Sequence, residues 1–176
     1  MNKKLQEVLN SPSKSKAEKS FGDVVFREGD KVMQIRNNYD IYWEGLDKKS
    51  YGSGVYNGDL GIISKITNDY IEVIFDDEKS VKYEAGIGEE LEHAYAITVH
   101  KSQGSEFKVV IMIITNGPPM LYTRNLLYTG VTRAKELLII LGKEYCINKM
   151  IDNVEIKKRN TGLKFKMNKY MEIFKM

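Results

Sequence analysis

Two clusters of polar residues have the types and spacing that phosphate binding would require. The first lies in the run AYAITVHKSQGSEF and offers hydroxyls, an imidazole, an ammonium and a glycine backbone amide. Its polar members are Thr98, His100, Lys101, Ser102, Gln103, Gly104, Ser105 and Glu106. Such groups suit the oxygens of a phosphate. A solvated loop is the alternative for this cluster alone, but a second cluster around Arg133 favours a binding site.

The elements that would position both clusters are short apolar segments. Ala94–Thr98 is predicted to be a buried strand that ends in the polar turn. Two longer apolar runs are predicted to be strands covered on both faces, and they are Val109–Ile114 and Leu137–Leu141. Leu121–Lys135 between them is predicted to be a helix with Leu127, Val131 and Ala134 facing the core and with Asn125, Thr129, Thr132 and Arg133 on its other side.

A strand, a helix and a second strand of these lengths imply a right-handed crossover within a parallel sheet. Ligands bind open α/β sheets just outside the carboxyl ends of the strands. We therefore expect an α/β fold in which the polar turn before Phe107 and the guanidinium of Arg133 share one edge of the sheet.

The composition of the 176 residues allows one medium domain, or one domain with a small insertion. The net charge of +3 is too small to indicate nucleic-acid binding by itself. Charge is uneven, because residues 54–92 hold three lysines and ten acidic residues, whereas residues 143–176 hold nine basic and four acidic ones. The single cysteine, Cys146, excludes an internal disulfide and is expected to be a small core residue. We expect a cytoplasmic protein, since no apolar run is long enough for a membrane span or a signal peptide.

The pattern along the chain predicts four parts. Residues 1–20 are expected to form a partial helix, in which Leu5 and Leu9 are four apart, and then a linker. Residues 21–53 and 90–145 are assigned to one split α/β domain. Short strands at roughly ten-residue spacing predict that residues 54–89 form a small inserted antiparallel barrel, whose acidic balance does not describe an oligonucleotide groove. Residues 146–176 are expected to be a basic helical tail in which Lys157, Lys158 and Arg159 would form a solvated face or approach phosphate.

The two clusters resemble motifs V and VI of superfamily 1 helicases, most closely the RecD-like, 5′-to-3′ branch (the exodeoxyribonuclease V alpha-subunit family). The motif V-like segment is Thr98–Phe107 and the motif VI-like segment is Tyr128–Lys135. KVMQIRNNYD followed by VYNGDLG is similar to the segment of that branch that enters an inserted barrel of the Src-homology-3 type. The resemblance covers about residues 20 to 145.

This resemblance implies the second RecA-like motor domain of a DNA helicase that acts in repair or recombination. Arg133 would be the catalytic arginine that reaches the γ-phosphate of ATP, with an ion pair at a helix end as its alternative role. Gly104 and Glu106 would bind ATP together with Arg133. The residues that would contact DNA are Thr98, His100, Lys101 and Ser102, together with Asn37 and Asn38, for which an Asx-type turn is the alternative.

The resemblance also implies cofactors and partners that lie outside this chain. ATP and Mg²⁺ would act in the full-length enzyme, and neither they nor any other metal is expected on this fragment, because the sequence has no GxxxxGK[ST] phosphate loop. Expected partners are single-stranded DNA, the missing N-terminal motor domain and possible other subunits of a nuclease–helicase complex, but no membrane. The fragment alone is expected to be inactive as an ATPase. Alternatives are a free-standing nucleic-acid-binding module and a protein-interaction module.

Overall fold

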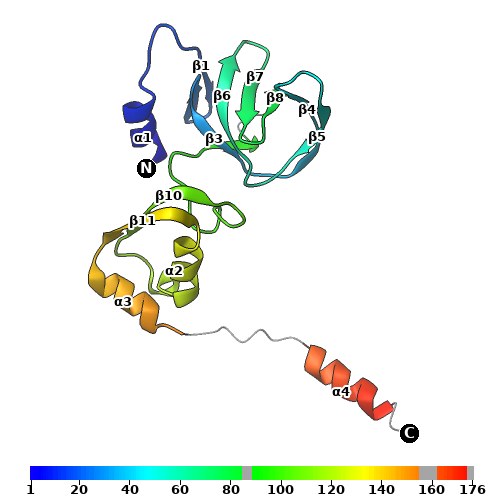
Figure 1. Ribbon diagram of the computed structural model, residues 1–176, viewed down its shortest axis with the longest axis vertical. Coiled ribbons are helices and arrows are strands. Elements are labelled where there is room, and N and C mark those ends of the chain that lie inside the picture. The colour runs from blue at the N-terminus through cyan, green and yellow to red at the C-terminus, as the bar shows by residue number, and fades with distance from the viewer. Residues whose placement is uncertain (85–88, 155–161, 174–176) are drawn as a thin grey trace. The chain divides into compact units, whose positions relative to one another are not determined.

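The computed structural model describes residues 1–84, 89–154 and 162–173, and it divides the chain into two compact units (Figure 1). Unit 1 comprises Met1–Val110 and Thr132–Leu138, and unit 2 comprises Ile111–Val131 and Ile139–Met176. No helix within the described ranges is long and apolar enough to cross a membrane.

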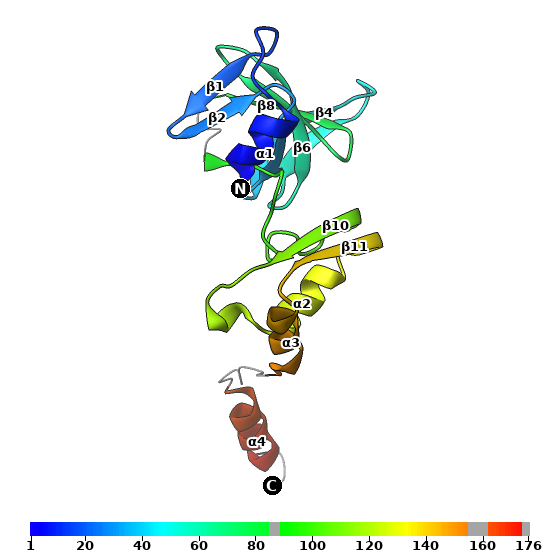
Figure 2. The same cartoon turned by 90° about the vertical axis from the view of Figure 1, so that its left-hand side faces the viewer.

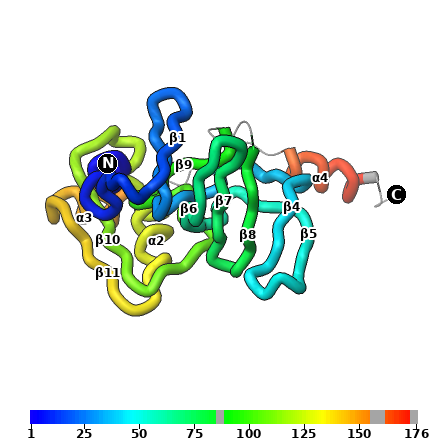
Figure 3. Tube along the Cα trace, turned by 90° about the horizontal axis from the view of Figure 1, so that it is seen from above, coloured from blue at the N-terminus to red at the C-terminus, as the bar shows by residue number. Residues whose placement is uncertain are grey.

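Unit 1 is built on a seven-stranded antiparallel sheet with the strand order β5-β4-β8-β7-β6-β3-β9. Its strands are β3 (Lys31–Gln34), β4 (Asn38–Gly45), β5 (Tyr51–Val55), β6 (Leu60–Ile66), β7 (Ile71–Phe75), β8 (Lys79–Tyr83) and β9 (Leu91–His93). Figure 3 shows β6, β7 and β8 side by side. The predicted succession of short antiparallel strands after Val55 is therefore confirmed.

Alternation along the strands of unit 1 places one set of side chains in a common core. In β7, Ile71, Val73 and Phe75 are buried, and in β8 Val81 and Tyr83 are buried. The same core takes Phe26, Val32, Val55, Ile63, Ile66 and Leu91 from other segments. Because these residues come from segments across the first 91 residues, the antiparallel fold depends on the whole of this stretch.

The position of β3, β4 and β5 differs from the sequence-based division. Residues 21–53 were assigned to the α/β domain, but β3 pairs with β6, and β4 pairs with β8. The β4–β5 hairpin is regular structure, because its strands pair antiparallel with Trp43 opposite Gly52. A Cβ added to Gly52 would lie 2.6 Å from the Trp43 ring. Lys79 lies 5.0 Å from the Trp43 ring centroid on the neighbouring strand. Glycine is therefore needed at position 52 to seat the tryptophan.

The N-terminal segment contains the predicted helix and an unpredicted hairpin. Helix α1 (Asn2–Leu9) is followed by β1 (Glu18–Phe21) and β2 (Val24–Arg27), which pair antiparallel. The predicted linker, which ended at residue 20, was therefore wrong where it overlaps β1. So was the expected apolar face of α1, because Leu9 is exposed while Gln6 and Asn10 are buried.

A buried carboxylate explains why Gln6 of α1 and the following Asn10 are turned inward. Figure 2 shows α1 next to the strands of unit 1. Asp30 is fully buried, and its Oδ1 accepts hydrogen bonds from Asn10 Nδ2 at 2.7 Å and the Tyr95 hydroxyl at 2.8 Å. Its Oδ2 accepts from Gln6 Nε2 at 2.6 Å and lies 3.0 Å from His93 Nε2. Burying the carboxylate costs free energy unless donors surround it, and Gln6 of α1 and the C-cap residue Asn10 supply two of them.

Strands β10 (Phe107–Ile114) and β11 (Ala134–Gly142) form a separate two-stranded sheet. The Phe107 N–H donates to the Arg133 carbonyl at 2.8 Å, and Gly142 lies against Ile114 at the other end, so the strands run parallel. The small parallel sheet of the expected α/β fold is present. The expected strand over Ala94–Thr98 is not, because β9 ends at His93 and turns follow.

The expectation that both faces of this sheet are covered does not hold within the described residues. Met112 and Ile114 are buried, but alternate side chains of both strands are about half exposed. These are Val109, Ile111 and Ile113 of β10, and Leu137, Ile139 and Leu141 of β11. Figures 1 and 2 show helices α2 and α3 on one side of the pair. The other face, which we call the open sheet face, therefore has no cover among the described residues.

Unit 2 contains the helical segments η2 (Pro119–Leu121), α2 (Arg124–Val131), α3 (Glu144–Asp152) and α4 (Leu163–Ile173). Its small core includes Tyr122, whose hydroxyl donates to the Thr115 carbonyl at 2.8 Å, and the fully buried Cys146. Cys146 is thus a core residue, as predicted. The basic run Lys157–Arg159 lies outside the described residues.

Candidate nucleotide and nucleic-acid site

Arg133 lies in the turn between α2 and β11, with its guanidinium against the turn that precedes β10. Its Nη1 donates to the Ser105 carbonyl at 2.9 Å, and its Nη2 donates to the Thr132 hydroxyl at 3.2 Å. The prediction that this residue is helical was wrong, since α2 ends at Val131. The Arg133 carbonyl accepts from the Phe107 N–H, so the backbone of Arg133 takes part in the pairing where β10 and β11 begin.

The motif V-like turn contacts Arg133 at Ser105, the residue that follows Gly104. Gly104 has a φ of +87°, a conformation that other residues rarely adopt. Glu106 lies two residues further on and pairs with Lys135 at 2.9 Å. The Lys135 ammonium lowers the pKa of the Glu106 carboxyl, and the charge of Arg133 adds to the effect. Sequence reasoning did not single out Lys135, although the Tyr128–Lys135 segment contains it.

The position of these groups on the sheet differs from the expected one. Glu106 immediately precedes β10, and Arg133 immediately precedes β11. The two polar segments therefore meet at the amino ends of two parallel strands, and not at carboxyl ends. The expectation failed because it assigned a strand to the segment before the turn, where the chain instead makes successive turns.

The four predicted DNA-contacting residues of the Thr98–Ser102 turn differ in their exposure. Thr98 and His100 are exposed, and the Thr98 hydroxyl accepts from the Lys101 N–H at 3.3 Å. Lys101 forms an ion pair with Glu92. Ser102 is buried, and its hydroxyl donates to the Val99 carbonyl at 2.8 Å. Ser102 therefore shapes the turn, while the other three side chains lie at its surface.

Asn37 and Asn38 take part in local hydrogen bonds of unit 1. The Asn38 amide donates to the Glu90 carboxylate at 3.0 Å, and its oxygen accepts from two backbone N–H groups that follow it. The Asn37 oxygen accepts from the Asn57 N–H at 2.9 Å. The two backbone bonds to the Asn38 oxygen are those of an Asx-type turn, whereas the bonds to Glu90 and Asn57 link distant parts of unit 1. The predicted role of both asparagines in DNA contact stays a prediction.

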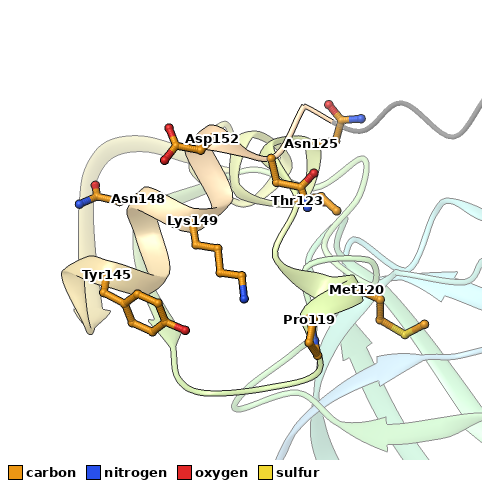
Figure 4. Close-up of a pocket in the computed structure, with 9 residues that line it drawn as sticks. Pro119, Met120, Thr123, Asn125, Tyr145, Asn148, Lys149 and Asp152 are labelled. Carbon is orange, nitrogen blue, oxygen red and sulfur yellow. The ribbon is translucent and has the colours of Figure 1, made fainter.

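Two hollows accompany these elements, one in each unit. The hollow in unit 2 measures about 1070 Å³ and lies between η2 and α3, where Figure 4 shows Lys149, Tyr145 and Pro119 around it. The Lys149 ammonium is 5.3 Å from the ring centroid of Tyr122. The hollow in unit 1 measures about 260 Å³ and includes Thr98 and Lys101 in its lining. Among the described residues, no group of three or more His, Cys, Asp or Glu side chains gathers that could hold a metal.

Two family models match consecutive regions of the chain. A model of the ATP-dependent RecD-like DNA helicase SH3 domain matches residues 1–79, and a model of the UvrD-like helicase C-terminal domain matches residues 93–141. The first region contains the strands from β1 to β7, and the second contains both motif-like segments. The match of the first model explains why β3, β4 and β5 share a sheet with the strands that follow them.

Curated relatives extend these matches. The RecBCD enzyme subunit RecD of Mycobacterium tuberculosis is 33% identical over 117 residues, which are 66% of this chain and 20% of that protein. The ATP-dependent RecD2 DNA helicase of Deinococcus radiodurans is 31% identical over 116 residues, 66% of this chain and 14% of that protein. An uncharacterized protein of Methanocaldococcus jannaschii is 37% identical over 154 residues, which are 81% of this chain and 13% of that protein. The chain spans 13% to 20% of the length of these relatives.

Solved structures support the fold. The crystal structure of Bacteroides Pif1 bound to single-stranded DNA matches with a TM-score of 0.51 at 20% identity, over 83% of this chain and 41% of that one. A complex of Bacteroides Pif1 with ADP-AlF3 and single-stranded DNA matches with a TM-score of 0.50 at 21% identity, over 89% and 38%. These likenesses indicate a RecA-like helicase fold with an SH3-type domain.

The matched regions together define part of a superfamily 1 DNA helicase. Within that class, the chain belongs to the RecD-like family and carries its SH3-type and C-terminal regions.

Proposed function

We propose that this chain contributes one wall of the ATP site and part of the single-stranded DNA track of a 5′-to-3′ RecD-like helicase. The observation that carries the proposal is the hydrogen bond from Arg133 Nη1 to the Ser105 carbonyl. It holds an always-charged, planar guanidinium next to the Gly104 turn and the Glu106 carboxylate. A planar guanidinium of this kind suits the phosphate oxygens of a nucleoside triphosphate.

Each group of this set has a chemical role that suits its type. The Arg133 guanidinium would neutralise charge that develops on the γ-phosphate during transfer to water. The Gly104 backbone can approach phosphate closely because no Cβ intervenes, and the Glu106 carboxylate can accept from a ribose hydroxyl. Mg²⁺ bound with ATP would supply charge neutralisation at the phosphates. Arg133 would add its own positive charge to that effect.

The Thr98–Ser102 turn would hold the phosphodiester backbone of the DNA. Its exposed hydroxyl, imidazole and ammonium groups can contact phosphates without reading the base sequence. This turn ends next to Gly104, so a nucleotide bound at Arg133 and a DNA phosphate bound at Lys101 would contact the same short segment. Because of that proximity, ATP binding could change the affinity of the turn for DNA.

The test replaces Arg133 by lysine in the helicase polypeptide that contains this region. The charge is kept but the planar fork is lost, so ATPase activity should fall by on the order of 10³-fold. Affinity for single-stranded DNA should stay within about twofold, because Arg133 lies outside the DNA-contacting turn. Lys108→Arg is the control for a conservative change at the same edge and should leave turnover unchanged. Unchanged ATPase activity in the Arg133→Lys variant would contradict the proposal.

The purified chain should not hydrolyse ATP by itself. Half of a nucleotide pocket cannot position the attacking water and the metal together, and positioning is most of the catalysis in phosphoryl transfer. Phosphate release that persists at the same rate in Arg133→Ala would come from a contaminant. Release by the wild-type chain that disappears in Arg133→Ala would contradict this expectation and would show a complete site.

A further inference from the structure

The 260 Å³ hollow of unit 1 combines an apolar floor with a polar rim. Met33, Ala96 and Ile97 supply the apolar lining, and Met33 and Ile97 belong to one packed cluster. Thr98, Lys101 and Glu92 supply hydroxyl, ammonium and carboxylate groups. Its volume suits one base with its sugar, and its rim suits one phosphate.

The rim carries an ion pair that bears directly on phosphate binding. Glu92 Oε2 contacts Lys101 Nζ, and the two side chains are 50% and 39% exposed. A carboxylate here occupies the place on the ammonium that a phosphate oxygen would take. An exposed pair of this kind contributes little free energy, so a phosphate can displace the carboxylate at small cost.

The wall of the hollow is held rigidly from two sides. Asn2 Nδ2 donates to the His93 carbonyl at 2.8 Å, and Asn2 Oδ1 accepts from the Ala96 N–H at 2.7 Å. The His93 ring in turn contacts the buried Asp30 carboxylate. Residues 93–96 are therefore fixed before any ligand arrives, which reduces the ordering cost of binding.

We propose that this hollow is a subsite for one nucleotide of single-stranded DNA, with Glu92 as a built-in competitor of the phosphate. The base and sugar contact the floor at Ala96 and Ile97, and the 5′-phosphate takes Lys101 from Glu92 and accepts from the Thr98 hydroxyl. Glu92 thereby lowers affinity, which lets a motor release the strand at each step. The proposal rests on the proposed function, because it assumes that the Thr98–Ser102 turn faces DNA.

The first test is Glu92→Gln in the full chain, measured by fluorescence anisotropy with a fluorescein-labelled oligothymidylate. Freeing Lys101 should raise affinity about two- to fivefold at low salt, the range expected for an exposed ion pair. The slope of log K against log salt should stay nearly the same, because Lys101 neutralises one phosphate in the complex of both proteins. Asp77→Asn, which breaks the exposed Lys79–Asp77 pair, is the control of equal charge change and should alter neither quantity.

A double-mutant cycle links the effect to Lys101. Lys101→Gln should weaken binding, and Glu92→Gln should add nothing in the Lys101→Gln background. If Glu92→Gln raises affinity equally in both backgrounds, the gain comes from overall charge, and the competitor role is wrong.

The second test probes the floor with Ala96→Leu and an oligonucleotide that carries abasic sites. Filling the hollow should weaken oligothymidylate binding, whereas the abasic strand should bind both proteins alike because it has no base to insert. The Ala96 N–H keeps its bond to Asn2, and circular dichroism checks that the variant is folded. Equal affinity of wild type and Ala96→Leu for oligothymidylate would rule out a base in the hollow. If the wild-type chain binds no oligothymidylate at low salt, the proposed function itself fails, which is a different result.

Discussion

At the scale of single residues, Asp30 shows how a buried charge determines which face of a helix turns inward. Burial would raise the pKa of the Asp30 carboxyl, but hydrogen bonds from His93, Asn10, Tyr95 and the Arg27 N–H outweigh it and lower the pKa. Burial and the bond to Asp30 raise the pKa of Tyr95 to about 12. The ionised carboxylate and the neutral phenol are thus the forms that the folded chain stabilises.

Asp30→Asn should destabilise unit 1 by about 3 kcal/mol, because it removes the charge that buried donors surround. A depressed pKa in the folded state stabilises the fold above the unfolded value of about 3.9, and that contribution is lost as pH falls through the folded pKa. The wild type should therefore lose stability below about pH 4, and the variant should lose less. Urea unfolding followed by Trp43 fluorescence measures both, with the exposed Asp23→Asn as the control. Parallel pH profiles for wild type and Asp30→Asn would contradict this account.

The sequence suggested candidate nucleotide-binding residues, but it gave no sign of the group around Asp30. Gly104, Glu106 and Arg133 stand in short segments that resemble helicase motifs, so a role in binding ATP could be predicted from local sequence, and it stays a prediction. The donors to Asp30 come from Gln6, Asn10, His93 and Tyr95, which are separated by up to 89 positions. No local pattern marks such a set, and the apolar spacing of Leu5 and Leu9 pointed to the wrong face of α1.

At the scale of elements, the antiparallel sheet depends on close approach of backbones at Gly61. A Cβ at this position would lie 2.7 Å from the Ile74 carbonyl oxygen on β7 and 2.8 Å from a methyl group of Val73. Neither neighbour can move without disturbing the pairing of β6 with β7. Glycine is therefore required by packing here, and not by an unusual φ.

Gly61→Ala should cost about 2 kcal/mol, within the range for overpacking a well-packed interior. Chemical denaturation monitored by Trp43 fluorescence should show a lower midpoint with an unchanged slope. Gly117→Ala is the matched control, because the nearest atom to its added Cβ is 3.9 Å away. A midpoint equal to that of the wild type would show that β6 and β7 have room to separate.

The open sheet face gives a second prediction for elements. Ile111 is 60% exposed and its neighbour Met112 is 8% exposed, because successive strand residues point to opposite sides. Ile111→Ser should change the free energy of unfolding by less than about 0.5 kcal/mol, whereas Met112→Ser should cost at least about 2 kcal/mol. Ile111→Ser should also reduce binding of the dye ANS and light scattering at high concentration. An equal loss of stability in both variants would mean that the open sheet face is covered in solution.

Sequence periodicity could not reveal this exposure. Runs such as Val109–Ile114 read as strands buried on both faces, and that reading describes a complete parallel sheet. The partners that would cover the face are not among the described residues, so the pattern carries information about contacts that those residues do not make. The start of β11 at Ala134 was missed for a related reason, since pairing with β10 ends α2 earlier than its apolar spacing predicts.

At the scale of the whole molecule, three cations in or next to the predicted binding segments form ion pairs among the described residues. Lys101 pairs with Glu92, Lys135 with Glu106, and Arg36 with Glu89 at 3.2 Å. The net charge of +3 leaves little excess for long-range attraction. DNA binding by this chain should therefore rely on a few close contacts.

The affinity for oligothymidylate should fall with salt only gently. A slope of log K against log salt of about −2 or shallower corresponds to three or fewer neutralised phosphates. Anisotropy titrations between roughly 50 and 200 mM salt measure it, with Lys101→Gln expected to remove about one phosphate from the slope. A slope steeper than about −5 would instead indicate an extended basic track that includes the C-terminal region.

The burial of Cys146 makes the chain a natural single-thiol reporter. A maleimide reagent cannot reach the sulfur while the Tyr122 core is closed, so its rate of attachment follows transient opening of unit 2 alone. Ligands that tighten this unit would slow the attachment, and those that act elsewhere would leave it unchanged. A cysteine introduced at the surface would react with a dye much faster than the buried Cys146, so the dye would label the new position selectively.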